Sequence, residues 1–370
     1  MNAPLAIQLK AEEQPMANIK SPGTHQRYLH PSLSMVHVLP KPLGAGMLRL
    51  EMLYVGICGT DVHLITADEQ TGYVKSSAPA SIPPEGRTIG HEGVGRICEI
   101  GQGVDGFTVG DVVTLESIYS CGRCQECRKG RPNQCERSVL LGMEIDGVFA
   151  SMTDVPARLA LRIDNHLNDE RLLKIGACLE PASVASLACK NAQITAGDHV
   201  VIFGGGPIGV FTAMLSKLIL GAASVSVVEP VEFRRKHAEN WCDMTFRPDE
   251  FLADKSTFDV VVDASGALEM TRESFQRIRP ACRVCLLART GGALTIDAVD
   301  HMLTNNISIV GSRGHLGGHF ETLLELATAR KLPLEDVVTS VVVGIEELLK
   351  TLNNPRIITD ENCKVLCRLN

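Results

Sequence analysis

Residues 199–209 read HVVIFGGGPIG, and this stretch predicts a nucleotide-binding fold for the second half of the chain. A short apolar run is followed by a G-x-G-x-x-G pattern, made by Gly204, Gly206 and Gly209. Glycine permits a tight turn after a strand, lets the backbone approach a pyrophosphate, and allows close packing of the next helix. The free N–H groups at the start of that helix attract phosphate. Pro207 suits the first helical turn, and together with Ile208 it completes the predicted cofactor loop.

Glu229 follows Gly209 by twenty residues and ends the next apolar run. A carboxylate at that point accepts hydrogen bonds from the adenosine ribose and repels a 2′-phosphate, so NAD is predicted rather than NADP. Arg234 and Arg235 leave NADP open, because either side chain could contact a phosphate, and Arg234 is counted among the cofactor-binding residues. A glycine turn that binds no ligand is the alternative.

The surrounding sequence alternates strand-like and helix-like segments. Helical patterns over 208–220 and 232–241 separate some of the apolar runs, and the runs lie at 199–203, 225–228, 258–262, 284–287 and 307–310. This alternation predicts an α/β fold with a doubly wound parallel sheet. Residues 47–155 instead contain short β-type runs broken by glycine, which predict a barrel-like β domain. We expect residues 1–30 to form an irregular extension, and the last segment to hold two amphipathic stretches and a final strand at 363–369.

Composition limits the classes of partner. The 370 residues carry a formal net charge of −7, and no basic run indicates nucleic acid. The N-terminus lacks the features of a signal or transit peptide, and the apolar stretches are interrupted before membrane-spanning length. Thirteen cysteines, many beside potential metal ligands, favour a reducing compartment. We therefore expect a cytoplasmic protein with a small-molecule partner, no nucleic acid and no membrane contact.

Four cysteines form the most distinctive local motif, C-x2-C-x2-C-x7-C, at Cys121, Cys124, Cys127 and Cys135. Four thiolates this close in sequence can surround one zinc ion and leave no position open for substrate, which predicts a structural site. Two disulfides or four free thiols are the alternative. Because such a site performs no chemistry, the reacting centre must lie elsewhere.

Three further segments carry residues that could bind a catalytic metal. These are Cys58 in GICGTDVH, His91 in GHEGVG and Glu180 in CLEPASVAS. Each alone is more often structural, and the interpretation depends on all three occurring in order around a nucleotide domain.

With these motifs together, the chain resembles the zinc-dependent medium-chain alcohol/polyol dehydrogenases over about residues 45–370. CGTDVH, GHE, the four-cysteine motif, LEPASV and GGGPIG occur in that family's order, and Glu180 resembles the sorbitol and glucose dehydrogenase branch. The resemblance implies a GroES-like zinc-binding catalytic domain over 1–185 and a Rossmann NAD-binding domain over 186–314. Residues 315–370 would return to the catalytic domain. It also implies a homodimer or a homotetramer.

The resemblance also assigns roles within the active site. Cys58, His91 and Glu180 would bind the catalytic zinc, with Glu92 as an occasional ligand, so each subunit would hold one catalytic and one structural zinc. Cys178 could compete with Glu180. Thr60 would begin a proton relay, and His63 would pass the proton on because histidine titrates near neutral pH.

The implied reaction is hydride transfer between a secondary alcohol of a polyol, sugar or cyclitol and NAD⁺, giving the ketone or lactone. CGTDVH also occurs in threonine dehydrogenases, so an amino-alcohol substrate stays open. A non-catalytic relative that binds NAD and zinc is the alternative from another class.

Overall fold

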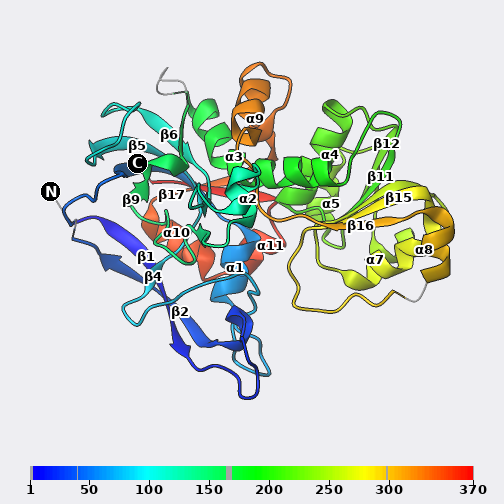
Figure 1. The fold of residues 1–370 in the computed structure, drawn as a ribbon, viewed down its shortest axis with the longest axis horizontal. Coiled ribbons are helices and arrows are strands. Elements are labelled where there is room, and N and C mark those ends of the chain that lie inside the picture. The colour runs from blue at the N-terminus through cyan, green and yellow to red at the C-terminus, as the bar shows by residue number, and fades with distance from the viewer. Residues whose placement is uncertain (1–2, 40, 164–168, 297–298, 370) are drawn as a thin grey trace. The chain divides into compact units, whose positions relative to one another are not determined.

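The computed structural model describes residues 3–39, 41–163, 169–296 and 299–369 (Figure 1). Contacts between Cα atoms divide the chain into two compact units. The catalytic unit comprises residues 1–180, 338–358 and 364–370, and the nucleotide unit comprises residues 181–337 and 359–363. The predicted boundary at 185/186 lies five residues later than this division.

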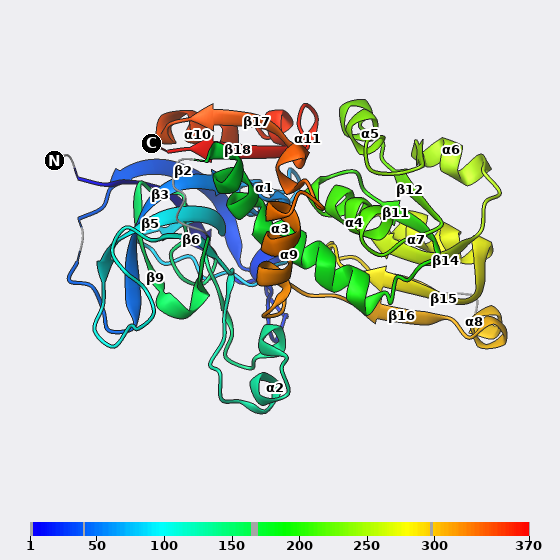
Figure 2. The ribbon, with the colours of Figure 1, turned by 90° about the horizontal axis from the view of Figure 1, so that it is seen from above.

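The nucleotide unit contains one parallel sheet in the order β13-β12-β11-β14-β15-β16 (Figure 2). Its strands are β11 (His199–Phe203), β12 (Ser224–Val228), β13 (Met244–Phe246), β14 (Phe258–Asp263), β15 (Ile278–Leu286) and β16 (Ser308–Gly311). Valine and isoleucine on both faces of the central strands are buried, as expected where helices cover a parallel sheet. The helices are α4 (Pro207–Leu218), α5 (Glu232–Ala238), α6 (Pro248–Ala253), α7 (Leu268–Ser274), α8 (Val299–Asn305) and α9 (His319–Thr328). The predicted doubly wound fold is confirmed.

The catalytic unit is built on a seven-stranded sheet in the order β10-β6-β5-β3-β18-β17, with β9 paired to β3. Its strands are β3 (Met47–Gly56), β5 (Glu92–Ile100), β6 (Val112–Leu115), β9 (Met152–Pro156), β10 (Ala160–Arg162), β17 (Val338–Val343) and β18 (Lys364–Arg368). Strands β17 and β18 come from the chain's last 33 residues, and β18 pairs antiparallel with β3. Short elements complete the unit: α1 (Gly59–Ile65), α2 (Gln125–Arg128), β7 (Ile118–Tyr119), β8 (Val139–Leu140), α10 (Ile345–Leu352) and α11 (Pro355–Thr359).

The expectation of an irregular N-terminal extension is wrong. Strand β1 (Leu5–Glu13) pairs antiparallel with β2 (Tyr28–His37) and with β4 (Arg87–Thr88), forming a separate three-stranded sheet. Ile7 and Leu9 of β1 are fully buried in the core of the catalytic unit. Apolar residues at alternate positions of residues 5–11 carry the period-2 signal of a half-buried strand.

The segment that follows β16 also differs from the expectation. Residues 315–337 belong to the nucleotide unit, so the chain re-enters the catalytic unit at residue 338 rather than 315. Helix α9 belongs to the nucleotide unit, and its residues Phe320, Leu323 and Ala327 are buried. Only the later strands β17 and β18 join the sheet of the catalytic unit.

One described helix, α3 (Glu170–Asn191), is long and apolar enough to cross a membrane by length and composition. Within its most apolar window, 72% is buried inside the structure. The core helix of a folded domain meets the same criterion, so α3 is weak evidence for a membrane span.

Candidate active site

Three predicted site residues of the catalytic unit lie together. The potential ligand atoms of Cys58, His91 and Glu92 are all within 4.8 Å of one another. Cys58 is the N-cap residue of α1, Glu92 begins β5, and His91 immediately precedes that strand. A thiolate, an imidazole and a carboxylate at that separation fit the donor set and the size of a zinc site.

Asp61 orients the histidine of this cluster. Its Oδ2 accepts a hydrogen bond from the Cys58 backbone N–H at 3.0 Å, and its Oδ1 lies 3.4 Å from His91 Nδ1. Burial opposes a charge on His91, yet the charges of Asp61 and Cys58 outweigh it and raise the pKa of His91 well above its usual range. The negative charges that favour a proton on His91 would equally favour a metal cation at this position. Contact at Nδ1 leaves Nε2 for a metal, as is common for metal-bound histidine.

Lys364 is a member of the site that the sequence did not reveal. Its fully buried ammonium group donates to Glu92 Oε2 in a short ion pair, and to the Ile57 carbonyl at 3.0 Å. Burial opposes protonation, but the Glu92 charge contributes to a raised pKa of Lys364. A Cβ on Gly56 would lie 2.2 Å from Glu92 Oε2, so only glycine leaves room for the pair. Glu92 Oε1 is buried without a hydrogen-bond partner among the described residues, which leaves one oxygen able to face a cation.

The predicted third ligand, Glu180, lies outside the group of three. It is a buried residue of α3, and its Oε1 accepts a hydrogen bond from the Ser117 hydroxyl at 2.6 Å. Burial raises the pKa of Glu180, and the charges of His91 and Glu92 act on it in opposite directions. Glu180 is therefore within electrostatic reach of the cluster. Cys178 is also buried in α3 and also lies outside the group.

We expect Lys364→Met to destabilise the protein strongly. The substitution removes a buried cation and leaves the Glu92 carboxylate unpaired, which costs about 3–5 kcal/mol. For a domain of this size we expect Tm to fall by about 8 °C or more in scanning calorimetry. Lys350→Met is the matched control, because Lys350 is exposed and pairs with the partly exposed Glu347 at 3.0 Å. Equal melting temperatures for the two variants would contradict a strong buried pair.

The predicted relay residues lie on α1. Thr60 places its hydroxyl 3.7 Å from Cys58 Sγ, and His63 follows three residues later, so both share one face of the helix. Burial lowers the pKa of His63, and the positive charge of Lys75 lowers it further. His63 is therefore neutral at pH 7 and able to accept a proton.

The four-cysteine motif folds into a compact lobe around α2. Cys124 Sγ lies 3.5 Å from Cys127 Sγ and 3.8 Å from Cys135 Sγ, and the Sγ atoms of all four cysteines are within 4.8 Å of one another. Sulfurs bound to one tetrahedral zinc at about 2.3 Å lie about 3.8 Å apart, whereas a disulfide needs about 2.05 Å. Backbone N–H groups of Arg123 and Cys124 lower the pKa of Cys121 to about 6, which favours the thiolate. The spacing fits zinc and excludes disulfides within this lobe.

The predicted cofactor loop joins β11 to α4. Gly204 has φ +102°, a conformation that residues with a side chain rarely adopt, and its N–H donates to the Val228 carbonyl at 2.9 Å. A Cβ on Gly209 would lie 1.8 Å from the Gly204 carbonyl oxygen. Both positions therefore require glycine. Gly206 is the N-cap of α4, and Pro207 and Ile208 form its first turn, as predicted.

Glu229 is held in place beside this loop. Its carboxylate accepts hydrogen bonds from the Gly205 N–H at 2.6 Å and from the Val231 N–H at 2.8 Å. Arg234 extends from α5 and donates to the Asn362 carbonyl at 3.0 Å. Its Nη1 lies 3.6 Å from the position of a Cβ on Gly206, so it lies beside the phosphate loop. Arg235 donates to the Glu229 backbone carbonyl at 3.0 Å.

We expect Glu229→Ala to change the choice of cofactor. Loss of the carboxylate removes a charged ribose acceptor and the repulsion of a 2′-phosphate. The NADP/NAD ratio of kcat/KM should rise by about tenfold, as expected for one charge-assisted hydrogen bond. Glu232→Ala is the matched control, because Glu232 lies on the same segment but is exposed and pairs with Lys236. No change in the ratio would rule out a ribose role for Glu229.

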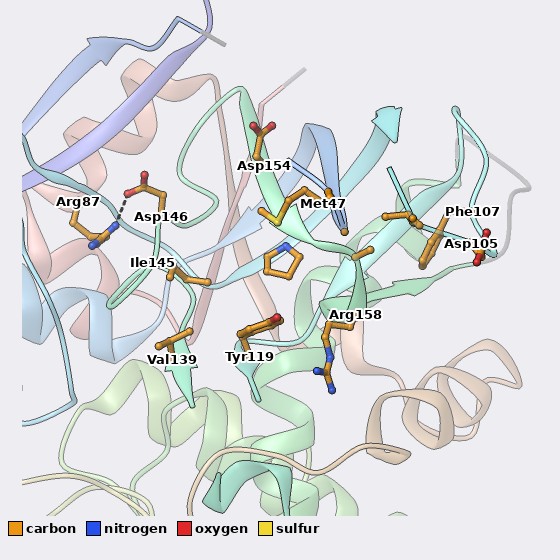
Figure 3. Close-up of a pocket in the computed structure, with 16 residues that line it drawn as sticks. Met47, Arg87, Asp105, Phe107, Tyr119, Val139, Ile145, Asp146, Asp154 and Arg158 are labelled. Carbon is orange, nitrogen blue, oxygen red and sulfur yellow. Dashed lines mark hydrogen bonds and ion pairs between the residues drawn. The ribbon is translucent and has the colours of Figure 1, made fainter. Parts of the chain in front are cut away.

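A cavity of about 880 Å³ in the catalytic unit does not coincide with this chemistry (Figure 3). The Arg87–Asp146 ion pair lies at its wall, together with Met47, Tyr119 and Phe107. None of the cysteine, histidine or glutamate residues discussed above lines it. Donor chemistry rather than cavity size therefore identifies the active site.

The comparisons with known proteins agree with this geometry. Residues 44–165 match the alcohol dehydrogenase GroES-like domain. The chain is 32% identical over 308 residues to a 2-dehydro-3-deoxy-L-galactonate 5-dehydrogenase from Pseudoalteromonas atlantica, covering 80% of this chain and 84% of that protein. It is 32% identical over 319 residues to an L-threonine 3-dehydrogenase from Pyrococcus horikoshii, covering 84% and 87%.

A solved structure of a putative alcohol dehydrogenase from Thermotoga maritima matches with a TM-score of 0.87 and 27% identity, over 99% of this chain and all of that chain. The chain therefore belongs to the zinc-dependent medium-chain alcohol dehydrogenase family. It is an oxidoreductase that acts on a small alcohol, with zinc and NAD as its cofactors. The predicted family, fold class and reaction type are confirmed.

Proposed function

We propose that this enzyme transfers hydride between a secondary alcohol of a polyhydroxylated substrate, namely a polyol, sugar or cyclitol, and NAD⁺. The cluster of Cys58, His91 and Glu92 is the observation that carries the proposal, because it gathers zinc ligands from separate segments of the catalytic unit. Glu229 supports NAD as the cofactor, since its carboxylate is fixed beside the phosphate loop.

Cys58 and His91 would hold the catalytic zinc, with Glu180 as the third ligand and Glu92 as an exchanging one. Zinc would supply Lewis acidity, which lowers the pKa of bound water to about 7 and would acidify a bound alcohol similarly. Lys364 balances the charge of Glu92 and so reduces its tendency to stay on the metal. The four-cysteine lobe would hold a second, structural zinc.

Thr60 and His63 would move the proton that the alcohol loses. The Thr60 hydroxyl lies next to the Cys58 sulfur and can receive a proton released there. Because the pKa of His63 is lowered, its ring is neutral and can accept that proton from the hydroxyl. His63 then delivers it to solvent.

An amino-alcohol substrate is the second candidate. It is supported by the similarity to L-threonine 3-dehydrogenase, which equals the similarity to the sugar-acid enzyme at 32% identity. A non-catalytic role has less support, because the ligand and relay residues are all present.

The proposed function is tested by initial rates of NADH formation with zinc-loaded protein. The substrates are acyclic polyols, sugars, cyclitols, L-threonine and simple alcohols, each with NAD⁺ and with NADP⁺. Selective turnover of a polyhydroxylated class with NAD⁺ is the expected result. Preference for L-threonine would establish the second candidate, and no turnover with zinc and NAD⁺ both bound would contradict catalysis.

Two further properties belong to the proposal. A homodimer or homotetramer is supported by Val299 and Leu303 of α8, which are 59% and 75% exposed on the same unit as the edge strand β16.

A cytoplasmic location is supported by the thirteen cysteines, all of them free within the described residues.

A further inference from the structure

Ser117 is a buried polar residue of the catalytic unit to which no role is assigned above. It follows β6 by two residues, and its hydroxyl donates to Glu180 Oε1 at 2.6 Å. The other carboxylate oxygen, Glu180 Oε2, makes no hydrogen bond within the part of the chain that the structure describes. The Glu180 carboxylate is therefore fixed through one oxygen and available through the other.

The packing of α3 on the sheet shows where this carboxylate lies. A Cβ on Gly176 of α3 would lie 2.6 Å from Val94 Cγ2, and the Gly176 carbonyl accepts a hydrogen bond from the Thr114 hydroxyl at 2.7 Å. Glu180 follows Gly176 by four residues, so it lies on the same face of the helix, about 6 Å further along. Its contact with Ser117, three residues after Thr114, shows that α3 and β6 run in the same direction here.

The register of β5 and β6 shows that this direction leads to the predicted metal ligands. Val94 pairs with Thr114 in an antiparallel ladder. Continued by three residues, the same register brings Ser117 level with His91. His91 is one of the three residues whose potential ligand atoms lie within 4.8 Å of one another. The helix and the ladder therefore both place the Glu180 carboxylate beside that cluster.

A carboxylate held through one oxygen can bind a metal through the other, and the donor that holds it sets its orientation. Such outer-shell partners are typical of metal sites, and their loss lowers metal affinity. Glu92 shows the same arrangement, because Lys364 holds its Oε2 while its Oε1 has no hydrogen-bond partner among the described residues. The alternative is that Ser117 competes with a cation for Glu180. The bond to Ser117 occupies only Oε1, which favours orientation over competition.

We propose that Ser117 is a positioning residue of the catalytic zinc site, whose hydroxyl fixes Glu180 Oε1 so that Oε2 is presented to the metal. This inference rests on the proposed function, in which Glu180 is the third zinc ligand. It adds the residue that aims this ligand.

Zinc affinity tests the proposal without any alcohol substrate. The protein is equilibrated with increasing concentrations of a zinc chelator, and the zinc retained per subunit is measured by atomic emission. The same titration of Cys58→Ala gives the reference curve for the four-cysteine lobe alone. We expect Ser117→Ala to bind the catalytic zinc about tenfold to a hundredfold more weakly than the wild-type protein. Ser117→Thr keeps a hydroxyl and should recover most of the loss.

Thr114→Val is the matched control. Thr114 is buried, precedes Ser117 by three residues and donates to the same helix, but its acceptor is the Gly176 backbone carbonyl rather than a carboxylate. The substitution should leave the zinc affinity at the wild-type value even if Tm falls. Equal losses of zinc affinity in Ser117→Ala and Thr114→Val would overturn the positioning role, because a general loosening of α3 would explain both.

A double-mutant cycle separates positioning from folding. Glu180→Gln alone should lower the zinc affinity, and adding Ser117→Ala should lower it no further, because the carboxylate that Ser117 positions is already absent. A further tenfold loss in the Glu180→Gln background would overturn the proposal. Unchanged zinc affinity in Glu180→Gln would do the same, as would unchanged or tighter zinc binding in Ser117→Ala, the result expected if Ser117 competes with the metal.

These results are separate from the test of the proposed function. Wild-type zinc affinity in Ser117→Ala, together with turnover of a polyol by the wild-type enzyme, would remove the positioning role and leave the proposed function intact. Coupled loss of zinc affinity in a protein that oxidises no alcohol of the panel would support the positioning role and count against the proposed function.

Discussion

Cys58→Ala should abolish hydride transfer while NAD binding survives. The substitution removes the thiolate from a cluster whose other members, His91 and Glu92, are held by Asp61 and Lys364. Without bound zinc, the alcohol keeps its ordinary pKa, many units above that of a metal-bound hydroxyl. We expect kcat to fall by about a thousandfold or more in steady-state assays. Calorimetric titration should give an unchanged Kd for NADH, because residues 199–209 and Glu229 are untouched.

Cys98→Ser is the control for this variant. Cys98 is an exposed thiol on β5, the strand that begins with Glu92, and its Sγ donates to the Arg49 carbonyl at 3.3 Å. It should keep wild-type activity and zinc content. Turnover by Cys58→Ala within tenfold of wild type would remove Cys58 from the metal site. A parallel loss of NADH binding would indicate misfolding instead.

Cys124→Ser should release the second zinc and destabilise the four-cysteine lobe. Cys124 is one of the two buried cysteines of the four, the other being Cys135, and its sulfur contacts both Cys127 and Cys135. Structural zinc contributes about 10–16 kcal/mol of binding free energy in small zinc domains, so losing one ligand is costly. We expect Tm to fall by about 10 °C and the zinc content to fall from two ions to one per subunit.

The same control applies here, because Cys98→Ser removes a thiol outside the lobe. Zinc content is measured by atomic emission and stability by scanning calorimetry on the same samples. A variant with two zinc ions and an unchanged Tm would contradict a structural metal in this lobe. If Tm falls while zinc content is unchanged, the serine has taken over as a ligand.

Several features could be predicted because their information lies in consecutive residues. Strand β11 is predicted to the residue, and β12, β14 and β16 within one residue at each end, since buried parallel strands appear as unbroken apolar runs. The start of β15 was missed by six residues, because Arg279, Pro280 and Arg283 interrupt its apolar pattern. The N-terminal strand β1 was missed because only a few alternating apolar residues mark it.

The active site could be predicted only in part. The motifs predict a metal site that contains Cys58, His91 and Glu92, and the structure brings these three residues together. It leaves the predicted ligand Glu180 outside the group, and the Glu180 carboxylate accepts a hydrogen bond from the Ser117 hydroxyl. Lys364 was not predicted, since a single lysine at the start of a strand usually faces solvent. Its partner Glu92 is 272 residues away, and only the pairing of β18 with β3, next to β5, buries the two together.

The sequence by itself determined the features whose residues lie close together along the chain. These are the phosphate loop at 204–209 and the four-cysteine lobe, whose potential ligands lie within 15 consecutive residues. In both, the chain needs only a local turn to bring the groups together. Tertiary structure alone decided the Glu92–Lys364 pair. That contact depends on which strands become neighbours, and the packing of whole sheets settles this rather than the residues beside each group.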